Sequence, residues 1–248
     1  VSSKEIKILA ASKVGVIRAT QTLVQMAEGY KGKAKLEPVC IEDWPAFKLR
    51  GYMHDVGRSY IPAEELVKQI ELFSRFKVNT FHWHLTENQA WRFEVKAYPA
   101  LTSAESMTRF PGKYYTQEDC KAVMAAAQKH GVIVIPEIDM PGHSEAFKRA
   151  MGFDMQSEEG KKVLKAALDE VVQVFADAPY IHIGGDEVST TPAYLNEMIA
   201  YVESKGKKAG IWNPINGISQ NQLNATLSQM WGTRGYAADG KANIDCRY

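Results

Sequence analysis

Residues 116–139, TQEDCKAVMAAAQKHGVIVIPEID, decide the fold class because they join a helical pattern directly to a buried strand. Thr116 is a suitable N-cap with Asp119 three residues later, and Gly131 is a suitable helix stop. The apolar run Val132–Pro136 that follows has the length of one strand. Helices that alternate with continuously apolar strands are typical of a parallel sheet covered by helices.

The same alternation runs along most of the chain. Further strands are predicted over residues 49–56, 78–85, 180–187, 208–213, 226–231 and 242–248, and further helices over residues 62–76, 157–176 and 191–206. About seven β/α units favour a TIM (β/α)8-type barrel over an open doubly wound sheet. No G-x-G-x-x-G follows the first strand, which weakens a dinucleotide-binding fold. Because a complete barrel has eight strands, we expect an α/β barrel that is incomplete at its C-terminus.

The first 45 residues are organised differently from the rest. One strand is predicted in residues 1–10, one helix in residues 15–29 and a Pro-containing linker, IEDWPAF, in residues 41–47. These residues look like the tail of a separate small α/β domain. The opening residues do not form a signal peptide, and a leader could have been lost upstream, so the localisation is unknown.

The composition of the chain argues against several classes of binding partner. The 248 residues are 45% hydrophobic and 24% charged, as in ordinary soluble globular proteins. The formal net charge of +1 gives no field that favours nucleic acid or a membrane surface. The run Val132–Pro136 is far too short for membrane insertion. The three cysteines are far apart without C-x-x-C spacing, so neither a zinc knuckle nor a disulfide framework is predicted.

Polar and aromatic side chains gather where the predicted strands end, which is where TIM barrels carry their chemistry. Acids, histidines and tryptophans together are the composition expected of a carbohydrate site, because indole faces stack on sugars and carboxylates bind hydroxyls. In strand order these residues are Arg50 and Asp55; His82, His84, Glu87 and Asn88; Glu137, Asp139 and His143; Asp186 and Glu187; Trp212; and Trp231.

Several of these residues also have a purely structural interpretation. His82 and His84 share one face of a predicted strand, either as ligands of a metal-dependent hydrolase barrel or as core histidines with satisfied hydrogen bonds. Asp55 and Arg58 are suited to a structural ion pair, and the two tryptophans to the core.

The adjacent acids Asp186 and Glu187 follow two glycines. Like charges side by side repel, so the pair is either a helix N-terminal charge pair or a functional site. The double glycine, Gly184 and Gly185, favours the second interpretation, because it indicates close approach of another chain segment or a ligand.

The blocks around these residues resemble glycoside hydrolase family 20, the β-N-acetylhexosaminidases. LRGYMHDVGR is similar to the family's opening strand, NTFHWHLTENQAWRFEVKAYPALT to its second-strand block, IPEIDMPGHSEAF to its third-strand block and HIGGDEV to its catalytic signature. The resemblance implies a catalytic barrel over residues 46–248, with strands one to about seven. Residues 1–45 resemble the end and linker of the accessory α/β domain that precedes the family's barrel.

The resemblance implies substrate-assisted catalysis, an exception among retaining glycosidases. The 2-acetamido oxygen of the substrate attacks the anomeric carbon and forms an oxazolinium intermediate. Glu187 would be the acid/base, and Asp186 would orient the acetamide N–H. Because successive strand side chains alternate, the two carboxylates are expected to face different parts of one sugar ring.

The resemblance also implies supporting roles. His143 would hydrogen-bond Glu187 and be oriented by Glu87, which stands where the family usually has Asp; the extra methylene predicts a looser or repositioned contact. The family's acetamide-binding tyrosine falls near Tyr248, which is left without a role. The implied substrate-binding residues are Arg50 for the C3 and C4 hydroxyls, Trp212 and Trp231 around the acetamide methyl, and Asp139.

The implied function is an exo-acting retaining hydrolase of glycans or glycoconjugates with terminal β-linked N-acetylhexosamine, GlcNAc or GalNAc. It needs no metal and no cofactor, and no oligomeric state is predicted. Two alternatives stay open: a metal-dependent hydrolase barrel, suggested by His82, His84, Asp139 and His143, and an inactive sugar-binding fragment, suggested by the missing eighth strand.

Overall fold

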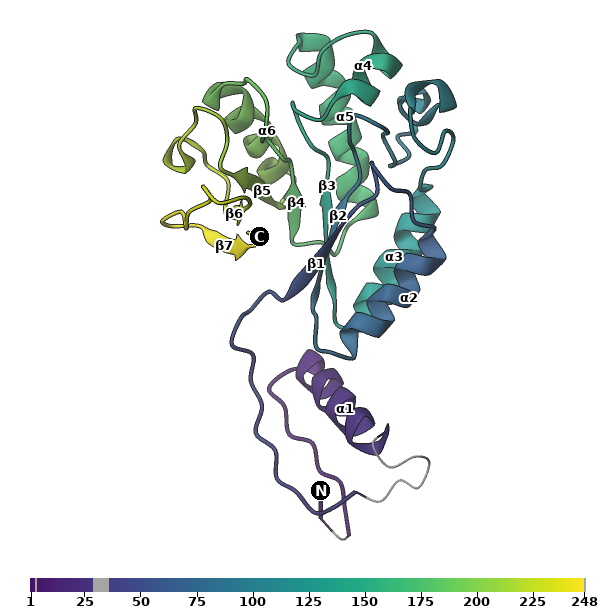
Figure 1. Cartoon of the computed structure of the whole chain (residues 1–248), viewed down its shortest axis with the longest axis vertical. Coiled ribbons are helices and arrows are strands. Elements are labelled where there is room, and N and C mark those ends of the chain that lie inside the picture. The colour runs from purple at the N-terminus through teal and green to yellow at the C-terminus, as the bar shows by residue number, and fades with distance from the viewer. Residues whose placement is uncertain (3, 29–35, 248) are drawn as a thin grey trace.

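The structure is a computed structural model that describes residues 1–2, 4–28 and 36–247 (Figure 1). In these residues one parallel sheet runs in the order β1-β2-β3-β4-β5-β6-β7. Its strands are β1 (Gly51–Asp55), β2 (Thr80–His84), β3 (Ile133–Glu137), β4 (Tyr180–His182), β5 (Lys208–Asn213), β6 (Leu227–Met230) and β7 (Ala242–Asp245).

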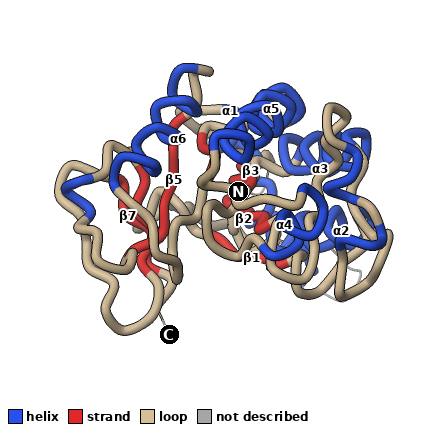
Figure 2. The backbone as a smooth tube through the Cα atoms, turned by 90° about the horizontal axis from the view of Figure 1, so that it is seen from above, coloured by secondary structure: helices blue, strands red, loops and turns tan. Residues whose placement is uncertain are grey.

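Helices follow most of the strands and cover the outer side of the curved sheet (Figure 2). The predicted capping box of Thr116 and Asp119 starts its helix, and Gly131 just beyond the end has a φ of 65°. No helix among the described residues has the length and hydrophobicity that crossing a bilayer requires. The helices are α2 (Ala63–Ser74), α3 (Gln117–Lys129), α4 (Glu145–Met151), α5 (Glu158–Val174) and α6 (Pro192–Ser204), with short 3-10 turns at Pro99–Thr102, Ala104–Ser106 and Gln220–Gln222.

The apolar core lies between this sheet and its helices. Phe81, Ile181 and Ile211 from the strands and Leu66 and Leu168 from the helices are fully buried in one cluster. Sequential parallel strands with helices on the outside are the arrangement of a TIM-type barrel, which confirms the predicted fold class. Within the described residues β1 and β7 are the two edges of the sheet, so the barrel wall is open between them.

The N-terminal segment differs from its prediction. Helix α1 (Lys13–Glu28) forms as expected, but the described part of residues 1–10 contains no strand, because no neighbouring strand pairs with it there. The helix has no buried side chain and meets the amino end of the barrel through polar contacts. Arg18 donates to the carbonyl of Gly131 at 2.6 Å, and Gln25 donates to that of Arg75 at 2.5 Å. Tyr248 lies outside the described residues.

Candidate active site

The register of the sheet lines up a row of polar side chains at its carboxyl end. Glu137 is paired with His84 of β2 and with His182 of β4, and His84 is paired with Asp55 of β1. Parallel neighbours with paired Cα atoms carry their side chains at the same level and on the same face. The last residues of β1 to β4 therefore form one polar floor beneath the loops.

The adjacent acids lie on a loop above this floor, not on a strand. Because β4 ends at His182, the predicted strand over residues 180–187 is too long, and the expected strand alternation of the two acids is wrong. The loop has left-handed φ values of 70° at Gly184, 104° at Gly185 and 52° at Glu187. The Asp186 side chain is 12% exposed, whereas the Glu187 side chain is 55% exposed. One acid is held by the protein and the other faces outward.

Gly184 lets another chain segment, the one that carries Asp139, approach the acid loop closely, as the double glycine predicted. A Cβ at Gly184 would lie 1.7 Å from Oδ1 of Asp139, so no other residue leaves room for that carboxyl group. Oδ1 of Asp139 accepts a hydrogen bond from the backbone N–H of Gly185 at 3.2 Å. Asp139 is fully buried, so the structure places it behind the acid loop, in a supporting position, instead of on the open rim.

His143 connects the acid loop to the second strand. Its Nδ1 lies 2.6 Å from Oε1 of Glu87, and its Nε2 lies 3.5 Å from Oε2 of Glu187 and 3.9 Å from Oδ1 of Asp186. Gly142 permits this approach, since a Cβ there would lie 2.7 Å from the carbonyl oxygen of Asp186. The extra methylene of Glu87 has therefore not loosened the contact that the sequence placed in doubt.

Burial and neighbouring charges shift the pKa values of His143, Asp186 and Asp139. The hydrogen bond to Glu87, together with neighbouring acids, raises the pKa of His143 to about 9 against the effect of its burial. Burial, reinforced by the charge of Glu137, raises the pKa of Asp186 to about 6. Burial and the charge of Asp186 raise the pKa of Asp139 well above its ordinary value. Burial and charge thus favour the neutral carboxyl group of Asp139 and the protonated imidazole of His143.

The structure does not bring Arg50 to this group, which corrects its predicted place. Arg50 precedes β1 at the amino end of the barrel, where its guanidinium donates to the carbonyls of Lys77 at 3.0 Å and Phe47 at 2.6 Å. There it lines a cavity of about 640 Å³ that is formed mainly by α1, the segment before it and the linker after it. The strand begins only at Gly51, after this arginine, so the side chain cannot reach the carboxyl end.

Arg58 is the arginine at the carboxyl end. It forms the predicted ion pair with Asp55 at 2.5 Å, and a second ion pair with Glu87 that the ion-pair interpretation missed. Gly57 makes this possible, because a Cβ there would lie 2.4 Å from Cβ of Glu87. The side chain remains 46% exposed. Its position just after the predicted end of β1 was the signal that could have identified it.

Known proteins are similar to this chain in sequence and in fold. The catalytic-domain model of glycosyl hydrolase family 20 matches residues 47–162. A β-hexosaminidase of Vibrio furnissii is 33% identical over 224 residues, which cover 76% of this chain and 36% of that protein. The crystal structure of a β-N-acetylhexosaminidase from Bacteroides fragilis is 32% identical with a TM-score of 0.79, over 90% of this chain and 53% of that one. The chain belongs to glycosyl hydrolase family 20.

A second structure is similar across the family 20 barrel. It is an exo-β-N-acetylglucosaminidase from Vibrio harveyi in complex with N-acetylglucosamine, with a TM-score of 0.78 and 27% identity, covering 93% of this chain and 46% of that one. The chain thus spans about a third to a half of the length of these relatives.

The two tryptophans of this family 20 chain lie in different surroundings. Trp212 ends β5 inside the barrel, is 6% exposed, and donates its indole N–H to Oε1 of Glu137 at 2.7 Å. Trp231 follows β6, is partly exposed, and donates its indole N–H to the carbonyl of Pro214 at 3.1 Å. The structure therefore joins Trp212 to the polar floor and Trp231 to the loop after β5.

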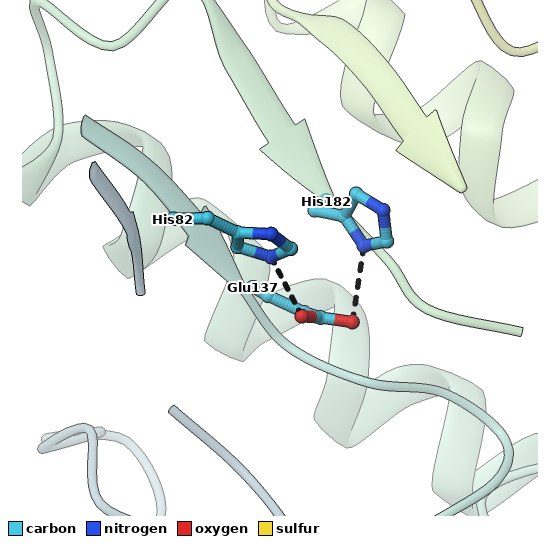
Figure 3. A group of neighbouring side chains, drawn as sticks. All are labelled: His82, Glu137 and His182. Atoms are coloured by element: carbon cyan, nitrogen blue, oxygen red, sulfur yellow. Dashed lines mark hydrogen bonds and ion pairs between the residues drawn. The ribbon is translucent and has the colours of Figure 1, made fainter. Parts of the chain in front are cut away.

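Three buried histidines surround Glu137. His82 Nε2 lies 2.7 Å from Oε2 and His182 Nδ1 lies 3.0 Å from Oε1 (Figure 3). His84 Nδ1 lies 2.6 Å from Oε2. Together with Trp212, four nitrogen atoms share two carboxylate oxygens. These groups fit a hydrogen-bonded carboxylate better than a metal site, because the ring nitrogens that face Glu137 already have it as their partner. This favours the interpretation of His82 as a satisfied core histidine, because both of its ring nitrogens are hydrogen-bonded. Nε2 of His84 is buried and has no hydrogen-bond partner within the described residues, so for His84 the structure supports a core position only.

Proposed function

We propose that the protein containing this chain is an exo-acting retaining glycoside hydrolase that removes terminal β-linked N-acetylhexosamine, GlcNAc or GalNAc, from glycans or glycoconjugates. The observation that carries the proposal is the division of the acid pair: Glu187 is exposed and next to His143, whereas Asp186 is buried. The names of the relatives, β-hexosaminidase and exo-β-N-acetylglucosaminidase, support the substrate class.

Glu187 is the proton carrier in this proposal. It donates a proton to the glycosidic oxygen while the C–O bond to the anomeric carbon breaks, and it later removes a proton from the attacking water. The contact from Nε2 of His143, 3.5 Å away, positions its carboxyl group. Glu87 in turn fixes the ring of His143 from the other side at 2.6 Å.

Asp186 holds the nucleophile, which belongs to the substrate. The acetamide oxygen forms a bond to the anomeric carbon as the leaving group departs, giving a cyclic oxazolinium ion. Asp186 accepts the acetamide N–H and stabilises the positive charge that develops on this group. Oδ1 of Asp186 is buried and makes no hydrogen bond within the described residues, so an acceptor is available for that N–H. Water then opens the ring with retention, and no cofactor takes part.

Other chain segments complete the proposal. Arg58, a half-exposed guanidinium beside the acids, replaces Arg50 as the group that binds sugar hydroxyls. Trp212 and Trp231 bound the pocket through their indole rings. Residues 1–45 are the end of an accessory α/β domain, to which helix α1 with its exposed side chains belongs.

Turnover of 4-nitrophenyl N-acetyl-β-D-glucosaminide by a Glu187→Gln variant tests the function. Because the amide cannot donate a proton as an acid does, we expect kcat/KM to fall by about 100-fold or more. Glu159→Gln, an exposed acid on α5, is the matched control and is expected to leave turnover unchanged. Full turnover in Glu187→Gln would overturn the assignment.

A further inference from the structure

A buried polar layer crosses the barrel interior beneath the acid loop. Five neighbouring strands contribute to it, and Glu137 of β3 is its centre, because the histidines of β2 and β4 and the indole of β5 all contact its two oxygens. The layer continues to β6, where the side-chain amide of Gln229 donates to Nδ1 of His82 at 3.1 Å. The residues of the layer are His82, His84, Glu137, His182, Trp212 and Gln229, all at most 6% exposed.

The hydrogen bonds define the charge of this layer. Since Nδ1 of His82 accepts from Gln229, its Nε2 carries the proton that is donated to Glu137. Burial lowers the pKa of His82 to about 4, so that ring is neutral. Burial opposes charge on His84 as well, but Glu137 outweighs it and raises the pKa of His84 to about 10. Burial would also raise the pKa of Glu137, but the histidines hold it well below its ordinary value. An ionised Glu137 with a protonated His84 results.

Trp212 contacts Glu137 through its side chain and the acid loop through its backbone. Its indole N–H is 2.7 Å from Oε1 of Glu137, while its backbone N–H donates to the carbonyl of Gly184 at 3.0 Å. The ring packs against His82 and His182, with centroids 5.5 and 4.8 Å away. Gly184 is two residues before Asp186, so the backbone of Trp212 is bonded to the start of the acid loop while its indole is bonded to Glu137.

We infer that Glu137 is a positioning residue that fixes the indole of Trp212 and thereby sets the selectivity of the site for the size of the N-acyl group. The inference rests on the proposed function, in which Asp186 binds the N–H that carries this acyl group. In that proposal the indole of Trp212 bounds the acyl pocket, and a ring held rigidly there limits the volume open to the acyl chain. The contact with Glu137 gives this rigidity, because rotation of the indole would leave its buried N–H without an acceptor.

Two variants test the link between Glu137 and Trp212. Trp212→Phe keeps a ring but removes the indole N–H, and Glu137→Gln keeps the shape but replaces an acceptor by an amide. We expect each to lower the ratio of kcat/KM for N-acetyl over N-propionyl 4-nitrophenyl β-glucosaminide by about tenfold, as for loss of a hydrogen bond to a charged group. The double variant should lose no more than the larger single effect, since both remove one contact.

Trp91→Phe is the matched control. Trp91 is also buried and donates its indole N–H at 2.8 Å, but to the backbone carbonyl of Phe93. This variant is expected to lower stability and to leave the acyl ratio unchanged. Active Glu137→Gln and Trp212→Phe variants with the parent's acyl ratio would overturn the inference. If Glu137→Gln does not fold, the ratio measured for Trp212→Phe decides the matter in the same way.

A spectroscopic readout separates this inference from the proposed function. The chain has five tryptophans, so the indole N–H resonance of Trp212 can be assigned by its loss in Trp212→Phe. We expect this resonance to be shifted by the carboxylate and to move in Glu137→Gln, with or without glycosidase activity. An unmoved resonance would overturn the contact itself. A parent without turnover but with the expected resonance shift would instead count against the proposed function alone.

Discussion

Nδ1 of His143 lies 2.6 Å from a carboxylate oxygen of Glu87, and this contact joins the loop after β3 to the loop after β2. Glu87 is buried and also pairs with Arg58, so one carboxylate organises two cationic groups at the rim. The contact has consequences for stability, because each partner shifts the pKa of the other.

The Glu87–His143 pair predicts how stability depends on pH. The folded pKa of His143 is raised from 6.5 to about 9, so its contribution is full below about pH 6.5 and is lost as pH rises through 9. Chemical unfolding of the parent and of Glu87→Gln should therefore differ most near about pH 6 and least near about pH 10. A difference in unfolding free energy that stays constant over this range would contradict the pair.

The raised pKa of Asp186 predicts how kcat/KM falls at acidic pH. Burial raises its pKa to about 6, and the proposed mechanism needs its ionised form. We therefore expect kcat/KM to fall as pH drops through about 6, and Asp186→Asn to lose most turnover together with this inflection. The pH dependence of kcat/KM for both proteins measures this. Retention of the inflection in Asp186→Asn would assign it to another group.

The two arginines offer a direct comparison. Arg58→Met should raise KM by about tenfold or more, because a guanidinium that binds sugar hydroxyls is lost. Arg50→Met should lower the melting temperature instead, since Arg50 holds the carbonyls of Lys77 and Phe47 at the far end of the barrel. Steady-state kinetics and thermal unfolding of both variants are needed. The reverse assignment of effects would restore Arg50 as the sugar-binding residue.

Gly184 is predicted to be irreplaceable for two separable reasons. An alanine there would be strained at a φ of 70° and would place its Cβ 1.7 Å from Asp139. Gly152 has a φ of 80°, and a Cβ added there would meet no atom within 4 Å, so Gly152→Ala measures strain alone. We expect about 1–3 kcal/mol of destabilisation for Gly152→Ala and about 1–3 kcal/mol more for Gly184→Ala. Equal losses in urea unfolding would show that Asp139 does not crowd the loop.

Much of the barrel follows from local patterns in the sequence. The capping box at Thr116 and the apolar run after Gly131 predicted a helix and a strand that the structure contains. The ends of strands were harder to predict from the sequence, because apolar residues such as Ile183 continue beyond the last residue of β4. The strand in residues 1–10 failed for a different reason: a strand needs a pairing partner, which local propensity does not supply.

The site could be predicted only in part. Asp186, Glu187, His143 and Glu87 were identified from motif blocks that resemble glycoside hydrolase family 20, and the structure brings them together. Arg50 was misplaced because a residue at the start of a strand and one just after its end are only a few positions apart in sequence. The role of Glu137 as the centre of a buried layer was missed, because it depends on the register of three strands.

The central claim is that the substrate supplies its own nucleophile, and fluorine substitution of the N-acetyl group tests it most directly. Each fluorine withdraws electrons from the acetamide oxygen and weakens it as a nucleophile, while the two carboxylates of the protein stay the same. Turnover of 4-nitrophenyl β-glucosaminides with N-acetyl, N-fluoroacetyl, N-difluoroacetyl and N-trifluoroacetyl groups is the measurement. The account predicts a steep fall in kcat along this series. A kcat that is independent of fluorine content would contradict it and would require a nucleophile from the protein.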